Sequence, residues 1–226
     1  ARLDSKIDNI SVYEARIRGG ATLAKTYPVD ADLVCGVPDS GLASAKGYSE
    51  ESGIPFGLAF HKNSYVGRTF IKPTQKERES SVKIKLSVLE SVVKGKRIVL
   101  VDDSIVRGTQ LRETTEFLYE CGAKEVHIRP ACPPLLYGCK YLNFSRGNSD
   151  MDLLARRMVQ ELEGDEGQQH LEEYADANSQ RGQCMLKTIC EKFGFNSLGY
   201  QSLDGLLEAI GLDRDKVCTY CWSGKE

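Results

Sequence analysis

The stretch RIVLVDDSIVRGTQ, residues 97–110, constrains the fold of this chain more than any other. Its four apolar residues, Ile98–Val101, are typical of a buried strand, yet the carboxylates of Asp102 and Asp103 follow at once. Two carboxylates side by side in a dry core would be very costly. The strand is therefore expected to end at the mouth of a sheet, where Mg²⁺ or sugar hydroxyls can reach the two acids.

The loop after these acids has the features of an anion site. A helix is expected to begin at Thr109 and to close at Gly122, before a further strand at Glu125–Pro130. Backbone N–H groups at a helix N-terminus attract anions, and Gly108 lets the main chain approach a phosphate. The hydroxyls of Ser104 and Thr109 can add hydrogen bonds, whereas the Walker pattern G-x-x-x-x-G-K-[ST] is absent.

A lone pair of aspartates is by default one exposed acid at a strand end and one acid that caps a helix. Here the strand, the acid pair and the glycine turn occur together. A phosphate cradle beside two acids is what a phosphorylated ribose requires, so the segment favours binding of such a sugar.

A second strand and turn precede this segment. Ser11 and Glu14 have the spacing of a capping box, which predicts a helix that ends before Pro28. A strand is expected at Leu33–Val37, and it is followed by the turn Pro38-Asp39-Ser40-Gly41. Ligands of α/β proteins bind at this carboxyl edge of the strands, so the turn is a candidate binding element.

The order of elements predicts the fold class. A helix from Leu42 to Glu51 follows the turn, and an apolar run, Ile54–Phe60, is expected to form the next strand. Strand, helix and strand in this order indicate a central, mostly parallel sheet flanked by helices.

Between Lys62 and Ser81 the apolar signal nearly vanishes. Long polar segments inside compact domains are either functional or disordered. Five basic residues lie in this one: Lys62, Arg68, Lys72, Lys76 and Arg78. A flexible basic flap over an anion and a solvated loop with tolerated charges explain this stretch equally well on its own.

The overall charge gives no reason to expect a nucleic acid or a membrane as partner. Lys and Arg number 30 and Asp and Glu 32, a net charge of −2, so any anion site must be local. No apolar run long enough to span a membrane and no leader segment is found, which favours a cytoplasmic protein. Its 8 cysteines then indicate buried thiols or a metal rather than a disulfide framework.

Several motifs resemble one known family. The segment around the acid pair resembles the phosphoribosyl diphosphate (PRPP) signature of type I phosphoribosyltransferases. The wider set, ISVYEAR, GVPDSG, SGIP, KNSYVGRTFIKPTQ and IVLVDDSIVRGT, is similar to the transferase domain of glutamine PRPP amidotransferases. The similarity runs to about Pro134 and returns near the C-terminus. It implies a type I phosphoribosyltransferase core at residues 1–135, with a flap, and a helical extension at residues 136–226 that completes the domain.

The resemblance implies the first step of de novo purine biosynthesis. Ammonia, released from glutamine by a separate N-terminal glutaminase domain, displaces pyrophosphate from C1 of PRPP to give 5-phosphoribosylamine. By resemblance, the substrate is bound by Pro38, Asp39, Ser40, Gly41, Asp102, Asp103, Ser104, Ile105, Val106, Arg107, Gly108 and Thr109. Mg²⁺ is assigned to Ser40, Asp102 and Asp103, and the catalytic flap residues are Lys62, Tyr65, Arg68 and Thr69.

Two departures from the family pattern limit this transfer of roles. Ser64 stands where the family usually has arginine, which removes one charge from the flap. The chain also starts at Ala1, at what resembles the junction after the glutaminase domain, so it is expected to use free ammonia. Homo-oligomers and nucleotide feedback are further family expectations.

The tail VCTYCWSGKE carries a C-x-x-C pair, which by itself is only a moderately specific metal signal. In one branch of the family such a pair holds a 4Fe-4S cluster. Cys218 and Cys221 match that pair, and Cys139 matches a third ligand, while the fourth is expected before Ala1. Substitution by Cys132, Cys184 or Cys190, zinc on four thiols, and an empty reduced site remain alternatives.

Two other functions remain open at this stage. A phosphoribosyltransferase that acts on a base would consume PRPP faster with a purine or pyrimidine than with ammonia. A regulatory module would bind PRPP without turnover, although the sequence shows no DNA-binding segment and retains the flap motif.

Overall fold

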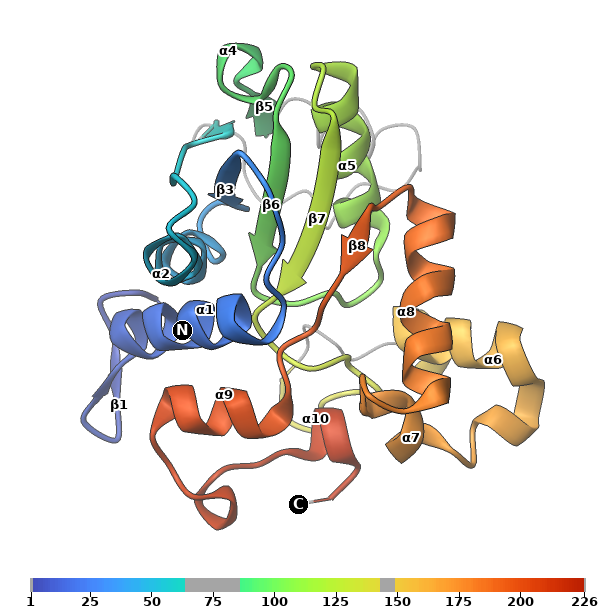
Figure 1. Ribbon diagram of the computed structural model, residues 1–226. Helices are drawn as coiled ribbons and strands as arrows, with labels where there is room; N and C mark the ends of the chain where they lie inside the picture. The colour runs from blue at the N-terminus through green and yellow to red at the C-terminus, as the bar shows by residue number, and fades with distance from the viewer. Residues whose placement is uncertain (1, 64–85, 143–148, 226) are drawn as a thin grey trace.

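The computed structural model describes residues 2–63, 86–142 and 149–225 (Figure 1). Within these ranges the main sheet has the order β3-β6-β7-β8, and every neighbouring pair is parallel. Its strands are β3 (Leu33–Gly36), β6 (Arg97–Asp102), β7 (Glu125–Pro130) and β8 (Ser197–Leu198). The predicted parallel sheet flanked by helices is confirmed.

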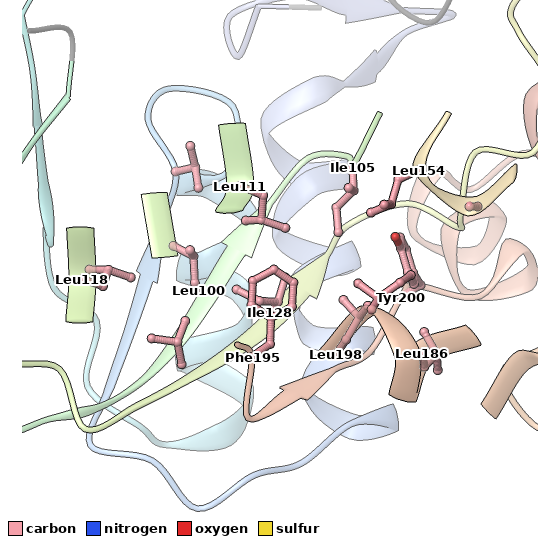
Figure 2. Packing of buried hydrophobic residues seen from close by; sticks show 14 of the residues in the cluster. Leu100, Ile105, Leu111, Leu118, Ile128, Leu154, Leu186, Phe195, Leu198 and Tyr200 are labelled. Carbon is pink, nitrogen blue, oxygen red and sulfur yellow. The ribbon is translucent and has the colours of Figure 1, made fainter. Parts of the chain in front are cut away.

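Alternating side chains of the central strands pack into two separate hydrophobic cores, one on each face of the sheet. Val34, Val99 and Val101 face α1 (Val12–Thr26) and α2 (Leu42–Ser52). The intervening residues of β3 and β6 pack on the opposite face, with α5 (Thr109–Glu120) and the C-terminal helices α6 (Leu154–Gly167) and α8 (Gln180–Phe193). Figure 2 shows part of this second core, which contains side chains from β6, α5, α6 and β8. Both faces of the strands are buried, as their continuous apolar runs require.

The predicted helix boundaries hold in the N-terminal part of the chain. Ser11 caps α1 by accepting a hydrogen bond from the backbone N–H of Glu14 at 3.3 Å, as the capping box predicts. The second helix, α2, ends at Gly53, which adopts a left-handed conformation. A short hairpin of β1 (Lys6–Ile7) and β2 (Ile10–Ser11) precedes α1.

The prediction of a sheet strand at Ile54–Phe60 is wrong. Phe56 forms only an isolated bridge to Val34, and the chain then enters β4 (Phe60–Lys62). This strand pairs with β5 (Leu86–Val88) in a separate antiparallel sheet, and α4 (Glu90–Val93) follows. In this pairing Lys62 lies opposite Leu86.

The C-terminal part contributes helices and one strand of the main sheet to the fold. The run Glu163–Gly182 contains α7 (Leu171–Ala175), which buries Leu171 and Tyr174. The chain then enters the main sheet as β8 and continues into α9 (Leu203–Ile210), which Ser202 caps. The 3₁₀ turns η2 (Asp150–Asp152) and η3 (Arg214–Lys216) and the helix α10 (Tyr220–Ser223) are the remaining elements of the described residues. In Figure 1 the carboxyl ends of β6 and β7 point toward α9 and α10.

Candidate functional site

The acid pair lies at the carboxyl end of the central strand β6. Asp102 is the last residue of the strand, and its Oδ1 accepts a hydrogen bond from the backbone N–H of Asp103 at 2.8 Å. Ser104 Oγ lies 3.2 Å from Asp103 Oδ1. Burial, followed by repulsion from the Asp103 carboxylate, raises the pKa of Asp102. Two negative charges are thus unfavourable here without a cation or hydroxyl donors to compensate them.

The loop that follows enters the N-terminus of α5 as the sequence predicted. Gly108 has a φ of 78°, a left-handed conformation that places the N-terminus of α5 directly after the loop, and Thr109 is the first helical residue. The side chain of Ile105 is buried in the core, so a contribution of this residue to anion binding must come from its backbone. We call Asp103–Thr109 the phosphate loop, after the role that the sequence predicts for it.

Contacts that the sequence did not indicate support this loop from the C-terminal part of the chain. The backbone N–H of Leu154 donates to the carbonyl oxygen of Val106 at 2.8 Å. Arg157 Nη2 donates to the carbonyl oxygen of Arg107 at 2.6 Å. Both donors lie in α6, about 50 residues after the loop, where no local pattern could have revealed them.

The turn Pro38–Gly41 lies against the end of β6. The backbone N–H of Val37 donates to the carbonyl oxygen of Val101 at 2.9 Å. A Cβ on Gly41 would stand 2.4 Å from the same Val101 oxygen, so only glycine allows this approach. The predicted pyrophosphate turn and Asp102 are therefore neighbours at one edge of the sheet.

Two further features of this turn were not predicted. The peptide bond between Pro38 and Asp39 is cis. Arg16, in α1, donates from Nη1 to the carbonyl oxygen of Ser40 at 2.8 Å. Arg16 belongs to the ISVYEAR motif, but nothing in that motif predicts its hydrogen bond to Ser40.

Lys62 is the only predicted flap residue that falls within the described ranges. It ends β4, and its ammonium group pairs with the carboxylate of Asp39 in the turn. Tyr65, Arg68 and Thr69 lie outside the described residues. The structure thus brings Lys62 to the Pro38–Gly41 turn and is silent on the other three.

The cysteines assigned to a cluster approach one another from two distant parts of the chain. The backbone N–H groups of Leu136 and Tyr137 both donate to the carbonyl oxygen of Cys221 at 3.0 Å. The rings of Tyr137 and Tyr220 pack at a centroid distance of 5.6 Å. These contacts attach α10 to the segment that carries Cys139.

The thiols of Cys139 and Cys221 also interact. Burial opposes ionisation of Cys139, but hydrogen bonds from the backbone of Tyr141 and Leu142 and from Cys221 lower its pKa. Burial and the contact with Cys139 raise the pKa of Cys221 to about 11. Cys218 is exposed. Among residues 2–63, 86–142 and 149–225, no three His, Cys, Asp or Glu side chains are grouped so that they could hold a single metal ion.

The sequence was compared with models of known protein families. Residues 8–132 match the family model described as a phosphoribosyl transferase domain. The chain belongs to this family. The amidophosphoribosyltransferase of Methanocaldococcus jannaschii is 45% identical over 229 residues, and that of Bacillus subtilis is 40% identical over 229 residues. Both alignments cover 100% of this chain but only 41% and 42% of the relatives.

A solved structure agrees with the architecture of the phosphoribosyltransferase domain. The glutamine PRPP amidotransferase of Bacillus subtilis, complexed with ADP and GMP, superposes with a TM-score of 0.78 at 39% identity. The match covers 100% of this chain and 44% of that one. The chain therefore has the type I phosphoribosyltransferase fold. None of its described helices is both long and apolar enough to cross a membrane.

Proposed function

We propose that this chain is the transferase part of an amidophosphoribosyltransferase, which transfers ammonia to C1 of PRPP with loss of pyrophosphate. The observation that carries the proposal is the position of the acid pair. Asp102, at the end of β6, and Asp103, the first residue of the phosphate loop, lie beside the Pro38–Gly41 turn at the carboxyl edge of a parallel sheet. The whole-chain similarity to two amidophosphoribosyltransferases supports the same function.

The two loops provide separate sites for the two ends of PRPP. Backbone N–H groups at the start of α5 would bind the 5-phosphate, with added bonds from the hydroxyls of Ser104 and Thr109. The Pro38–Gly41 turn would bind the pyrophosphate. Asp102 and Asp103, at the junction of β6 and the phosphate loop, would accept hydrogen bonds from the ribose hydroxyls.

The donor set fits Mg²⁺. This ion is usually bound by one or two carboxylates together with substrate phosphates and water, so two protein acids are sufficient. A cation held by the pair would relieve the repulsion from Asp103 that, after burial, raises the pKa of Asp102. Asp102, Asp103 and the hydroxyl of Ser40 would hold the ion, which supplies charge neutralisation for the departing pyrophosphate.

Catalysis then requires positioning and electrostatics rather than a side-chain nucleophile. The nitrogen of ammonia forms a bond to C1, the bond from C1 to the pyrophosphate oxygen breaks, and the nitrogen loses one proton. Negative charge grows on the leaving group, where Lys62 and, by resemblance, Arg68 would stabilise it. Closure of a flap that also carries Tyr65 and Thr69 would exclude water, which competes with ammonia for C1.

The proposal extends to the rest of the protein. Amidophosphoribosyltransferases are about two and a half times as long as this chain, which spans 41% of the Methanocaldococcus relative. We assign glutamine hydrolysis to an N-terminal glutaminase domain and expect a cytoplasmic homo-oligomer that acts in purine biosynthesis.

We also propose that Cys139, Cys218 and Cys221 provide three of the four thiolates of a 4Fe-4S cluster. The support is the attachment of α10 to the Cys139 segment and the contact between the Cys139 and Cys221 thiols. Iron and sulfide analysis of anaerobically purified protein tests this assignment, and stoichiometric zinc without iron would contradict it.

The function is tested by measuring pyrophosphate release from PRPP with Mg²⁺, with and without ammonium at alkaline pH. Release that depends on ammonium, with phosphoribosylamine as product, is the expected result. The variant with Asp102→Asn and Asp103→Asn serves as the inactive control.

Two outcomes would redirect the proposal. If adenine, hypoxanthine, uracil or orotate accelerates PRPP consumption and ammonium does not, the chain is a base phosphoribosyltransferase. If PRPP binds tightly but neither ammonium nor a base causes release, the chain acts as a PRPP-binding regulatory module.

A further inference from the structure

We propose that Arg157 is a positioning residue that sets the conformation of the phosphate loop from outside the binding site. The inference rests on the proposed function, because it takes the loop as the site of the 5-phosphate. It assigns a role to a segment, residues 149–157, that lies outside the recognisable motifs.

The argument starts from the backbone groups of the loop. When the N–H groups of a loop turn toward an anion, its carbonyl groups turn away and require donors of their own. The carbonyl oxygen of Val106 accepts from the backbone N–H of Leu154 at 2.8 Å. The carbonyl oxygen of Arg107 accepts from Arg157 Nη2 at 2.6 Å. Two successive carbonyls are thus held by α6.

Arg157 is itself anchored on the opposite side. Its Nη1 donates to the carbonyl oxygens of Met151 and Asp152, at 3.1 Å and 2.9 Å. One guanidinium therefore joins the phosphate loop to η2. Arginine suits this role because its planar fork presents several donors in fixed directions, whereas lysine offers a single point of attachment.

Apolar contacts fix the loop from beneath. Ile105 and Leu154 are 4% and 1% exposed, belong to one core cluster and lie next to each other in Figure 2. A Cβ on Gly108 would stand 3.0 Å from Leu154 Cδ2, which shows how closely α6 approaches the loop. Leu154 thus anchors the loop from below while Arg157 holds its more exposed end.

The contact has a specific consequence for ligand binding. Without Arg157, the carbonyl of Arg107 loses its donor and the loop can rotate toward other conformations. Such a change affects the N–H groups that face the 5-phosphate but not the Pro38–Gly41 turn. Loss of Arg157 should therefore weaken binding of the 5-phosphate of PRPP without weakening binding of its pyrophosphate.

The experiment measures binding of ribose 5-phosphate and of Mg²⁺-pyrophosphate by calorimetry, using the full chain. Arg157→Gln should lower the affinity for ribose 5-phosphate about tenfold and leave the affinity for Mg²⁺-pyrophosphate unchanged. Arg157→Lys, which keeps the charge but not the fork, should give an intermediate loss. The control is Arg181→Gln, because Arg181 also joins two segments of the C-terminal part, through ion pairs with Glu163 and Glu173, and no contact of Arg181 with the phosphate loop is found among the described residues.

The outcomes separate this inference from the proposed function. Equal losses for the two ligands, or no loss in either Arg157 variant, would overturn the positioning role while wild-type binding leaves the function intact. Failure of the wild type to bind ribose 5-phosphate would overturn both. If Arg157→Gln does not fold, a selective loss in a folded Arg157→Lys variant still supports the inference.

Discussion

The two elements proposed to bind the ends of PRPP are supported in different ways. The Pro38–Gly41 turn lies against Val101 and accepts a hydrogen bond from Arg16, which belongs to the ISVYEAR motif and is 24 residues from Ser40. The phosphate loop belongs to the more recognisable motif, yet Arg157, the donor to its Arg107 carbonyl, lies 50 residues away. The residues of a recognisable motif therefore do not by themselves determine the conformation of its loop. Its backbone still depends on partners that the motif does not contain.

The largest effect that separates the two elements is expected at Lys62. The Lys62→Gln substitution removes the cation that pairs with Asp39 in the turn, and should lower kcat about 100-fold because charge develops on the pyrophosphate. Steady-state kinetics with ammonium and circular dichroism would check this. An unchanged kcat would show that the Lys62 pairing with the turn has no role in the reaction. Binding of ribose 5-phosphate should stay the same.

A smaller effect is expected from Gly108→Ala in the phosphate loop. The substitution places a side chain at a φ of 78° and 3.0 Å from Leu154, so ribose 5-phosphate affinity should fall about tenfold. Calorimetry with both ligands measures the effect.

Gly211→Ala is the matched control for this substitution. Its φ is 82° but nothing lies within 4 Å of the added Cβ. Both variants should lose about 1 kcal/mol of unfolding free energy, since both force alanine into a left-handed conformation. Equal ribose 5-phosphate affinities in the two variants would refute a special role of the loop geometry.

A more modest effect is expected from Arg16→Gln. The carbonyl of Ser40 loses a donor at 2.8 Å, and pyrophosphate affinity should fall about fivefold while ribose 5-phosphate affinity is retained. Together with Arg157→Gln, this variant forms a reciprocal pair in the same calorimetric assay. If both arginine variants lower the affinity for the same ligand, the turn and the phosphate loop do not bind separate ends of PRPP.

The smallest effect concerns the stability of the metal-free protein. The pKa of Asp102 is raised in the folded state, so the folded protein holds this proton more tightly than the unfolded chain. Stability attributable to this group is therefore lost as pH rises through the raised pKa. Asp102→Asn should melt a few degrees higher than the wild type at alkaline pH, and the difference should shrink toward about pH 4.

Thermal melts across this pH range, without Mg²⁺, test the effect. A variant that is less stable than the wild type at every pH would show that the Asp102 carboxylate stabilises the fold. A gain in stability together with lost activity would mark Asp102 as a residue retained for function.

Local signals account for the parts of the site that the sequence predicted. The apolar run before Asp102, the start of α5 at Thr109 and the strand at Glu125–Pro130 are each encoded within a few residues, and each is confirmed. The apolar run Ile54–Phe60 was wrongly predicted to be a strand of the main sheet, because an apolar run indicates burial but not the strand with which a segment pairs.

Contacts between distant segments could not be predicted in this way. The carbonyl acceptors of Ser40 and Arg107 are backbone atoms, so no residue type at these positions signals the arginine that binds them. The docking of α10 beside Cys139 likewise depends on backbone bonds to Cys221. Resemblance to a family pointed to those cysteines, whereas composition did not.

The central claim is that one site at the carboxyl edge of the sheet binds PRPP between two loops. An equilibrium titration of the full chain with PRPP and Mg²⁺ tests it most directly, with the Asp102→Asn and Asp103→Asn double variant beside the wild type. The account predicts saturable one-site binding by the wild type and an affinity at least about 100-fold weaker in the variant. No binding by the wild type, or equal binding by both proteins, would contradict it.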